Sequence, residues 1–250
     1  MATASPGMIL SEMSCKMTSS LALPAAFSLT TFERPAASTM DWDDSGMRSL
    51  LFAVLIACSG AAAAARTILV YGDSLSTAYG LPQSAGWVAL LDERLKQRRL
   101  DYTVVNASIS GETTAGGAAR IEAVLARTRP AIVIVELGGN DGLRGLPVAQ
   151  IKANLTAIIR ASKRAGARVL LVGLQMPPNY GAKYNSEFRS AFREVARDER
   201  TVLVPFIFEG VSDTREMVQE DNIHPTAAAQ PIMLENVWRR LAGIVVPSKQ

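Results

Sequence analysis

One serine, one histidine and one aspartate have the types and the spacing of a nucleophile and its base. Ser74 lies in the sequence Gly-Asp-Ser-Leu-Ser at residues 72–76, and His224 is the single histidine among 250 residues. A serine hydroxyl is a weak nucleophile at neutral pH unless a neighbouring base removes its proton, and that base needs a third group to orient it. We therefore take Ser74, His224 and the nearby Asp221 as a candidate catalytic triad.

The spacing of Asp221 and His224 favours a direct contact. The two residues are three positions apart, so both side chains can face one side of a turn and the carboxylate can accept the Nδ1–H of the imidazole. Pro225 disfavours helical geometry at His224, which indicates a loop before the last helix. Two alternatives stay open, because a lone histidine is more often structural or solvated and because Ser74 is of a type that caps helices.

Acyl transfer also needs hydrogen-bond donors for the oxyanion of the tetrahedral intermediate. The candidates are the backbone N–H of Ser74, the backbone N–H of Gly111 and the side-chain amide of Asn140. The alternative for the Gly-Gly-Asn-Asp sequence around Asn140 is an ordinary turn. Asp73 and Asp141 neighbour these residues, and we interpret both as acceptors that fix loops rather than as triad acids.

The elements that must position these residues alternate between short apolar runs and longer stretches with helical spacing. The runs predict strands at residues 67–71, 102–106, 131–137, 168–174 and 201–205, and the stretches predict helices at residues 85–99, 114–127, 148–165, 185–200 and 231–244. Near-continuous hydrophobicity within the runs indicates strands buried on both faces. The alternation predicts one α/β domain of three layers, α/β/α, around a parallel five-stranded sheet. Ligands of such sheets bind at the carboxyl ends of the strands, and Ser74, Gly111 and Asn140 follow the first three.

The first 65 residues differ in composition from the rest. Residues 47–65 begin with Met-Arg-Ser, continue with a short apolar run and end in five alanines, which is the layout of a secretory signal peptide. The apolar run is shorter than the roughly 20 residues that span a bilayer. Residues 1–46 have a methionine, serine and threonine bias without a period, and we interpret them as a non-native or disordered extension upstream of the true start. Residues 66–250 are then the mature domain, in the periplasm or secreted.

Cysteine and charge restrict the possible partners. Cys15 and Cys58 both precede residue 66, so the mature domain can have neither a disulfide nor a cysteine-ligated metal. The alternative is that Cys58 belongs to a lipobox and becomes the lipidated first residue of an anchored protein, which is the one membrane contact we expect. Residues 66–250 carry 23 Lys and Arg against 18 Asp and Glu, a net charge of +5, which is too dilute for a nucleic-acid surface.

Two other site types are excluded by missing residues. Residues 111–117 have the outline of a phosphate-binding loop, but Gly117 stands where the lysine must be. No Gly-x-Ser-x-Gly sequence surrounds Ser74, which argues against the α/β-hydrolase fold.

Four blocks in the order residues 72–76, Gly111, residues 138–141 and residues 221–225 resemble the GDSL or SGNH hydrolase superfamily. Residues 105–113 and 135–145 are similar to its bacterial periplasmic branch of thioesterases, arylesterases and lysophospholipases. The resemblance implies a flavodoxin-like sheet with a shallow, open site and no metal or organic cofactor. It also implies the roles of the individual residues: Ser74 as nucleophile, His224 as general base, Asp221 as its orienting acid, and Ser74, Gly111 and Asn140 as the oxyanion hole.

An apolar groove beside Ser74 is expected to hold the acyl chain. Its candidate residues lie after the third and fourth strands: Leu143, Leu146, Pro147, Met176, Pro177, Pro178 and Tyr180. The alternative is that several of them pack the loops. We expect a monomeric, secreted serine hydrolase that cleaves carboxylic esters and thioesters of small acyl substrates through an acyl-enzyme. The alternatives are an acetyl esterase acting on polysaccharides and a lipid- or glycan-binding module with an idle triad.

Overall fold

Five parallel strands form the centre of the computed structural model, which describes residues 65–212 and 214–245. The strands are β1 (Arg66–Gly72), β2 (Tyr102–Asn106), β3 (Ile132–Glu136), β4 (Arg168–Val172) and β5 (Val202–Val204). Their order across the sheet is β2-β1-β3-β4-β5, and every neighbouring pair is parallel. This is the flavodoxin-like order, in which ligands bind where the strand order reverses, between β1 and β3. The predicted three-layer α/β fold is confirmed.

The predictions for the N-terminal part concern residues that the structure does not describe. The extension at residues 1–46 and the signal peptide at residues 47–65, apart from Ala65, lie outside the described residues, as do Cys15 and Cys58. The proposed domain organisation therefore stays a prediction. Across residues 65–212 and 214–245, no helix is both long enough and apolar enough to cross a bilayer.

The inner strands are aliphatic because helices cover both of their faces. Every residue of β3 is buried, as are residues 68–72 of β1 and 169–172 of β4. Complete burial of one valine, leucine or isoleucine side chain contributes about 1.5–3 kcal/mol, so these runs hold the strand ends rigidly in place. β2 lies at an edge of the sheet, and of its five residues only Tyr102 is buried.

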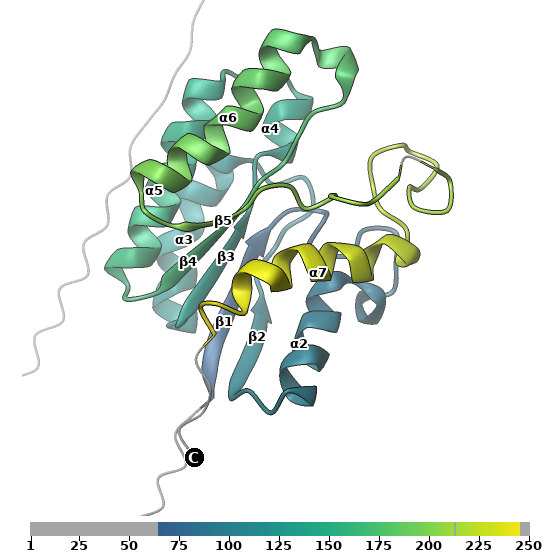
Figure 1. The fold of residues 1–250 in the computed structure, drawn as a ribbon. Coiled ribbons are helices and arrows are strands. Elements are labelled where there is room, and N and C mark those ends of the chain that lie inside the picture. Colours follow the sequence, from purple (N-terminus) through teal and green to yellow (C-terminus); the bar gives the residue numbers. More distant parts are fainter. Residues whose placement is uncertain (1–64, 213, 246–250) are drawn as a thin grey trace, which may run out of the picture. The chain divides into compact units, whose positions relative to one another are not determined.

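Two helical layers enclose the sheet (Figure 1). The longer helices are α2 (Trp87–Gln97), α3 (Thr114–Thr128), α5 (Val148–Arg164), α6 (Ala182–Asp198) and α7 (Gln230–Leu241). α5 packs between α3 and α6 on one face, and α2 packs against α7 on the other. Short elements lie in the connections: η1 (Gln83–Ala85), α4 (Gly139–Leu143), η2 (Pro178–Tyr180) and η3 (Ala227–Ala229).

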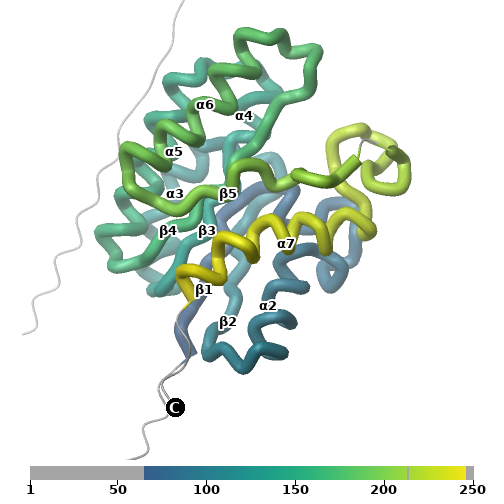
Figure 2. The backbone as a smooth tube through the Cα atoms, in the orientation of Figure 1, coloured from purple at the N-terminus to yellow at the C-terminus, as the bar shows by residue number. Residues whose placement is uncertain are grey.

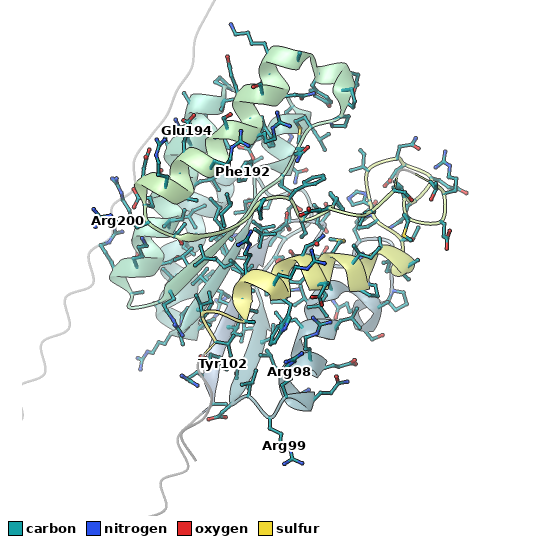
Figure 3. The ribbon with its side chains drawn as sticks, in the orientation of Figure 1. Arg98, Arg99, Tyr102, Phe192, Glu194 and Arg200 are labelled. Carbon is teal, nitrogen blue, oxygen red and sulfur yellow. The ribbon has the colours of Figure 1, made fainter. Side chains whose placement is uncertain are left out.

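α6 shows how one sequence periodicity serves both the core and the surface. Phe192 is buried and its ring meets that of Phe188 edge to face, with the centroids 5.3 Å apart. Glu194, two positions later, lies on another side of the helix and forms an ion pair with Lys152 of α5 (Figure 3). A helix turns by about 100° per residue, so an apolar face and a polar face arise from this spacing.

The structure differs from the predicted bounds mainly in the connections. The predicted helix at residues 85–99 begins only at Trp87, because Gly86 has an extended backbone between η1 and α2. α6 begins at Ala182 rather than at residue 185. Asn140 lies in the helix α4 instead of in a simple turn, and the side chain of Asp141 in this helix accepts the N–H and the hydroxyl of Thr114.

Candidate active site

Ser74 lies directly beyond the carboxyl end of β1, in a turn that packs closely against β3. The backbone of Gly72 brings this turn so near to Glu136 that an added Cβ would lie 2.7 Å from the carboxylate atom Oε2 of that residue. A larger side chain at position 72 would therefore push the turn away from the sheet. The Asp73 carboxylate accepts the N–H of Leu75 at 3.0 Å, which stabilises the turn.

Asp221 and His224 form a unit inside one loop. Oδ1 of Asp221 accepts the backbone N–H groups of Ile223 and His224, both at 2.9 Å, and Oδ2 lies 2.5 Å from the imidazole Nδ1. The carboxylate thereby places the proton of a neutral imidazole on Nδ1 and leaves Nε2 as an acceptor. Nε2 lies 2.9 Å from the hydroxyl oxygen of Ser74. The structure thus brings together three residues that span 150 positions of the chain.

The charge of Asp221 is well stabilised. Burial works to raise the pKa of this carboxyl, but the hydrogen bonds from the His224 backbone, the imidazole and the Ile223 backbone outweigh it and lower the pKa to about 2. Asp221 is therefore an anion at every pH at which the imidazole can act as a base. An anion beside Nδ1 favours the imidazolium that forms when Nε2 takes a proton.

Two backbone N–H groups lie unused beside Ser74. Among the hydrogen bonds of the described residues, neither the N–H of Ser74 nor that of Gly111 has a protein acceptor. Gly111 has a φ of +80°, a left-handed conformation that favours glycine, and it lines the same cavity as Ser74. These groups have the chemistry of an oxyanion hole.

Asn140 has a different environment from the two backbone groups. Its Nδ2 donates to the carboxylate Oδ2 of Asp73 at 3.0 Å and to the backbone carbonyl of Glu112 at 2.9 Å. An amide nitrogen has only two hydrogens, so both are engaged within the protein. For Asn140 to bind an oxyanion, one of its N–H groups has to donate to the oxyanion in place of its present acceptor or in addition to it.

A pair of buried acids lies beneath the turn that carries Ser74. Asp73 and Glu136 are each at most 1% exposed, and Oε2 of Glu136 accepts the hydroxyl of Ser76 at 2.7 Å. Burial is the main cause that raises the pKa of both carboxyls, and the negative charge of Asp73 raises that of Glu136 further. Oε1 of Glu136 is buried without a hydrogen-bond partner. This environment favours the neutral, protonated form of Glu136.

The raised pKa of Glu136 makes stability depend on pH in a defined direction. At a pH between the ordinary glutamate pKa of about 4.3 and the raised pKa, the folded protein holds a proton that the unfolded chain releases, so the free energy of unfolding falls by about 1.4 kcal/mol per pH unit. The isosteric variant Glu136→Gln lacks this proton. Chemical denaturation from pH 4 to pH 8 is expected to show a stability difference that shifts in favour of the variant as pH rises.

The exposed Glu187 of α6 supplies the control for this experiment. The free energy of unfolding of Glu187→Gln is expected to change with pH in parallel with that of the wild type. Parallel pH profiles for Glu136→Gln and the wild type would contradict the assignment of a proton to Glu136.

A cavity of about 650 Å³ opens beside Ser74 and His224. Of the predicted groove residues, Leu143, Met176, Pro177 and Pro178 line it, whereas Leu146, Pro147 and Tyr180 do not. The hydroxyl of Tyr180 instead donates to the backbone carbonyl of Leu143 and holds that residue in place.

Several residues of this cavity were missed in the sequence. Leu174 follows β4 and the aromatic pair Phe206 and Phe208 follows β5, and all three line the cavity. The rule that ligands bind at the carboxyl ends of parallel strands would have found the two phenylalanines if it had been applied to β5 as well as to the first four strands. Leu174 was missed because the predicted fourth strand ran to residue 174, whereas β4 ends at Val172. Ile223 and Tyr79 also line the cavity, and each is about half exposed.

The ring of Tyr79 covers the imidazole of His224, with the centroids 4.4 Å apart. It restricts the rotation of the imidazole and shields one of its faces from water. In the part of the chain that the structure describes, no group of three or more His, Cys, Asp and Glu side chains could hold a metal ion. The groups that the structure places at this site are a hydroxyl, an imidazole, a carboxylate and backbone N–H donors.

Comparison with known proteins agrees with this chemistry. Residues 70–231 match the model of the GDSL-like lipase/acylhydrolase family. Esterase TesA of Pseudomonas aeruginosa is 54% identical over 183 residues, which cover 73% of this chain and 91% of the relative. The thioesterase 1/protease 1/lysophospholipase L1 of Escherichia coli strain K12 is 40% identical over 196 residues, which cover 78% of this chain and 93% of the relative.

A solved structure extends the comparison to three dimensions. The crystal structure of the psychrotrophic esterase EstA from Pseudoalteromonas sp., inhibited by monoethylphosphonate, superposes with a TM-score of 0.69 at 39% identity and covers 72% of this chain and 98% of that chain. The resemblance of the four sequence blocks is thereby confirmed. This chain belongs to the GDSL-like lipase/acylhydrolase family.

Proposed function

We propose that this hydrolase cleaves carboxylic esters and thioesters of acyl substrates through a covalent acyl-Ser74 intermediate. The observation that carries the proposal is the unbroken chain of contacts from Ser74 Oγ to His224 Nε2 at 2.9 Å and from His224 Nδ1 to Asp221 at 2.5 Å. Ser74 and His224 both line a largely apolar cavity.

Each step follows from the atoms that are present. Ser74 Oγ attacks the carbonyl carbon while its proton moves to His224 Nε2, and the electron pair of the carbonyl bond moves to its oxygen. The N–H groups of Ser74 and Gly111 hydrogen-bond this oxyanion. Asn140 is the third donor once one of its N–H groups turns from its present acceptor to the oxyanion. The tetrahedral intermediate then expels the alkoxide or thiolate, which takes the proton from the imidazolium. A water molecule then attacks the acyl carbon while His224 Nε2 takes its proton. The second tetrahedral intermediate expels Ser74 Oγ, which takes this proton back, and the carboxylic acid is released.

The cavity supports a substrate with an apolar acyl chain. Leu143, Leu174 and Met176, with the two phenylalanines after β5, offer hydrocarbon surface next to Ser74. Burial of each methylene contributes about 0.8 kcal/mol, so the groove favours longer chains until it is filled. Thioesterase, lysophospholipase and arylesterase are names that relatives carry, and these activities share one transition state at the acyl carbon. We place this activity outside the cytoplasm on the strength of the signal-peptide pattern at residues 47–65.

The proposal is tested with a series of p-nitrophenyl esters from acetyl to dodecanoyl. The value of kcat/KM is expected to rise by up to about fourfold per added methylene and to level off where the groove ends. Turnover of acetyl alone would favour an acetyl esterase of polysaccharides, and no turnover at any length would favour a binding module. Either outcome contradicts the proposal.

A matched pair of leucine variants locates the acyl chain. Leu143 ends α4 and lines the cavity, and Leu146, three positions later in the connection to α5, is also half-buried but does not line it. Leu143→Asn is expected to flatten the chain-length dependence, while Leu146→Asn leaves it unchanged. Equal effects of the two variants would place the chain elsewhere.

A further inference from the structure

The loop that carries the base is largely self-contained. We call residues 214–226 the histidine loop; they belong to the segment that leaves the layers after β5 and returns at α7 (Figure 2). Within the loop, Gln219 N donates to the carbonyl of His224 at 2.8 Å and Thr226 N donates to that of Met217 at 2.9 Å. These bonds and the Asp221 contacts give the loop its shape, but they do not fix its position on the sheet.

Residues 106–111, which end with the oxyanion donor Gly111, are joined in a different way to residues 72–77, which carry Ser74. The hydroxyls of Thr77 and Ser110 lie 2.7 Å apart, Asn106 Nδ2 donates to the carbonyl of Ser76 at 2.7 Å, and Ile109 N donates to that of Gly72 at 3.1 Å. Several hydrogen bonds thus join these two segments independently of the histidine loop.

Gln219 provides the corresponding connection for the histidine loop. Its Nε2 donates to the carbonyl of Tyr79 and to that of Pro225, both at 2.9 Å. Among the described residues, the bond to Tyr79 is the only hydrogen bond besides that of Ser74 and His224 between the histidine loop and residues 73–81. Tyr79 is also the residue whose ring contacts the imidazole.

Gly80 is adapted to this contact. It has a φ of +75°, and an added Cβ would lie 2.3 Å from the amide oxygen of Gln219. A residue with a side chain at this position would displace the amide that holds the two loops together.

We propose that Gln219 is a positioning residue. It holds the histidine loop against residues 73–81, which carry the nucleophile, and so sets the distance between Ser74 and His224. This inference rests on the proposed function, in which that distance governs proton transfer. Asp221 and His224 lie in the same loop, so their contact survives the loss of Gln219, and only the approach of Nε2 to Oγ is lost.

The first test is kinetic and uses the full chain. Gln219→Met keeps the length of the side chain and removes both donated hydrogen bonds. With p-nitrophenyl butyrate, kcat is expected to fall by about 10- to 100-fold, as small misplacements of catalytic groups do, while KM stays within about twofold. Gln97→Met, on an exposed glutamine at the end of α2, is the matched control and is expected to leave both constants unchanged.

The second readout does not depend on turnover. His224 is the only histidine of the chain, so in an untagged protein its NMR signals need no assignment. Because the ring of Tyr79 lies 4.4 Å from the imidazole, its ring current is expected to shift the carbon-bound imidazole protons to high field. Gln219→Met is expected to move them toward the position of free histidine while the Nδ1–H signal persists. Gly80→Ala is expected to reproduce both the shift and the loss of kcat.

The outcomes separate this inference from the proposed function. An active wild type with unchanged kcat or unmoved imidazole protons in Gln219→Met would overturn the positioning role. A variant that loses the Nδ1–H signal together with several degrees of Tm would also overturn it, because the loop itself would then have unfolded. Failure of the proposed function shows instead in the wild type, which would not hydrolyse the ester, and the NMR readout would still report how the loop is seated.

Discussion

Ser74→Ala and His224→Ala are each expected to lower kcat by about 10⁶-fold, and the double variant is expected to be no slower than either single one. The reason is that the hydroxyl and the imidazole act as one unit: Ser74 Oγ and His224 Nε2 lie 2.9 Å apart, and among the described residues neither of these two atoms has another hydrogen-bond partner. A residual rate above that of water is expected from the N–H groups of Ser74 and Gly111, which both variants retain.

This result is measured by single-turnover kinetics with p-nitrophenyl butyrate, since contamination by other esterases can hide such low rates. Ser186→Ala, at an exposed position of α6, supplies a control that removes a serine hydroxyl without touching the triad. Additive losses in the double variant would show that Ser74 and His224 act separately, and the proposed mechanism would then be wrong.

Asp221→Asn is expected to lower kcat by about 10⁴-fold. The amide that replaces the carboxylate keeps an oxygen that can accept the N–H groups of Ile223 and His224, as Asp221 Oδ1 does, so the loop keeps its shape. The nitrogen of this amide then faces the imidazole Nδ1 and donates to it, which moves the histidine proton to Nε2. An imidazole that carries its proton on Nε2 cannot accept the proton of Ser74.

The tautomer is read directly by NMR of the single imidazole, alongside kcat. Asp73→Asn serves as a comparison, because Asp73 is the other acid of the Gly-Asp-Ser turn and makes no hydrogen bond to His224 in the structure. A loss of less than tenfold in Asp221→Asn, with Nδ1 still protonated, would mean that another group orients the base.

The sequence was informative where local chemistry decides the structure. The runs that became β1, β3 and β4 are almost entirely aliphatic, and an aliphatic run of five residues between polar turns has few alternatives to a buried strand. Asp221 and His224 were paired correctly because three positions of spacing already bring their side chains together. The polar residues after successive parallel strands meet at one edge for the same topological reason.

The sequence was less informative where distant residues decide. Nothing in the Gly-Gly-Asn-Asp sequence predicts a helix, and α4 forms around an aspartate that binds Thr114 of α3. Both hydrogens of Asn140 are engaged by Asp73 and by the Glu112 carbonyl, contacts that depend on the packing of three separate loops. The role of Gln219 depends on a glycine 139 positions earlier in the chain.

The direction of β1 has a consequence for handling the protein. β1 begins at Arg66 and ends at Gly72, just before Ser74, so the entry to the domain lies at the opposite edge of the sheet from the nucleophile, about 20 Å away by the rise of a strand. α7 runs back toward that same edge (Figure 1). A linker joined before Arg66 or after Val245 therefore leaves the catalytic edge facing outward, and the domain can be immobilised on a support through either end with its substrate entrance unobstructed.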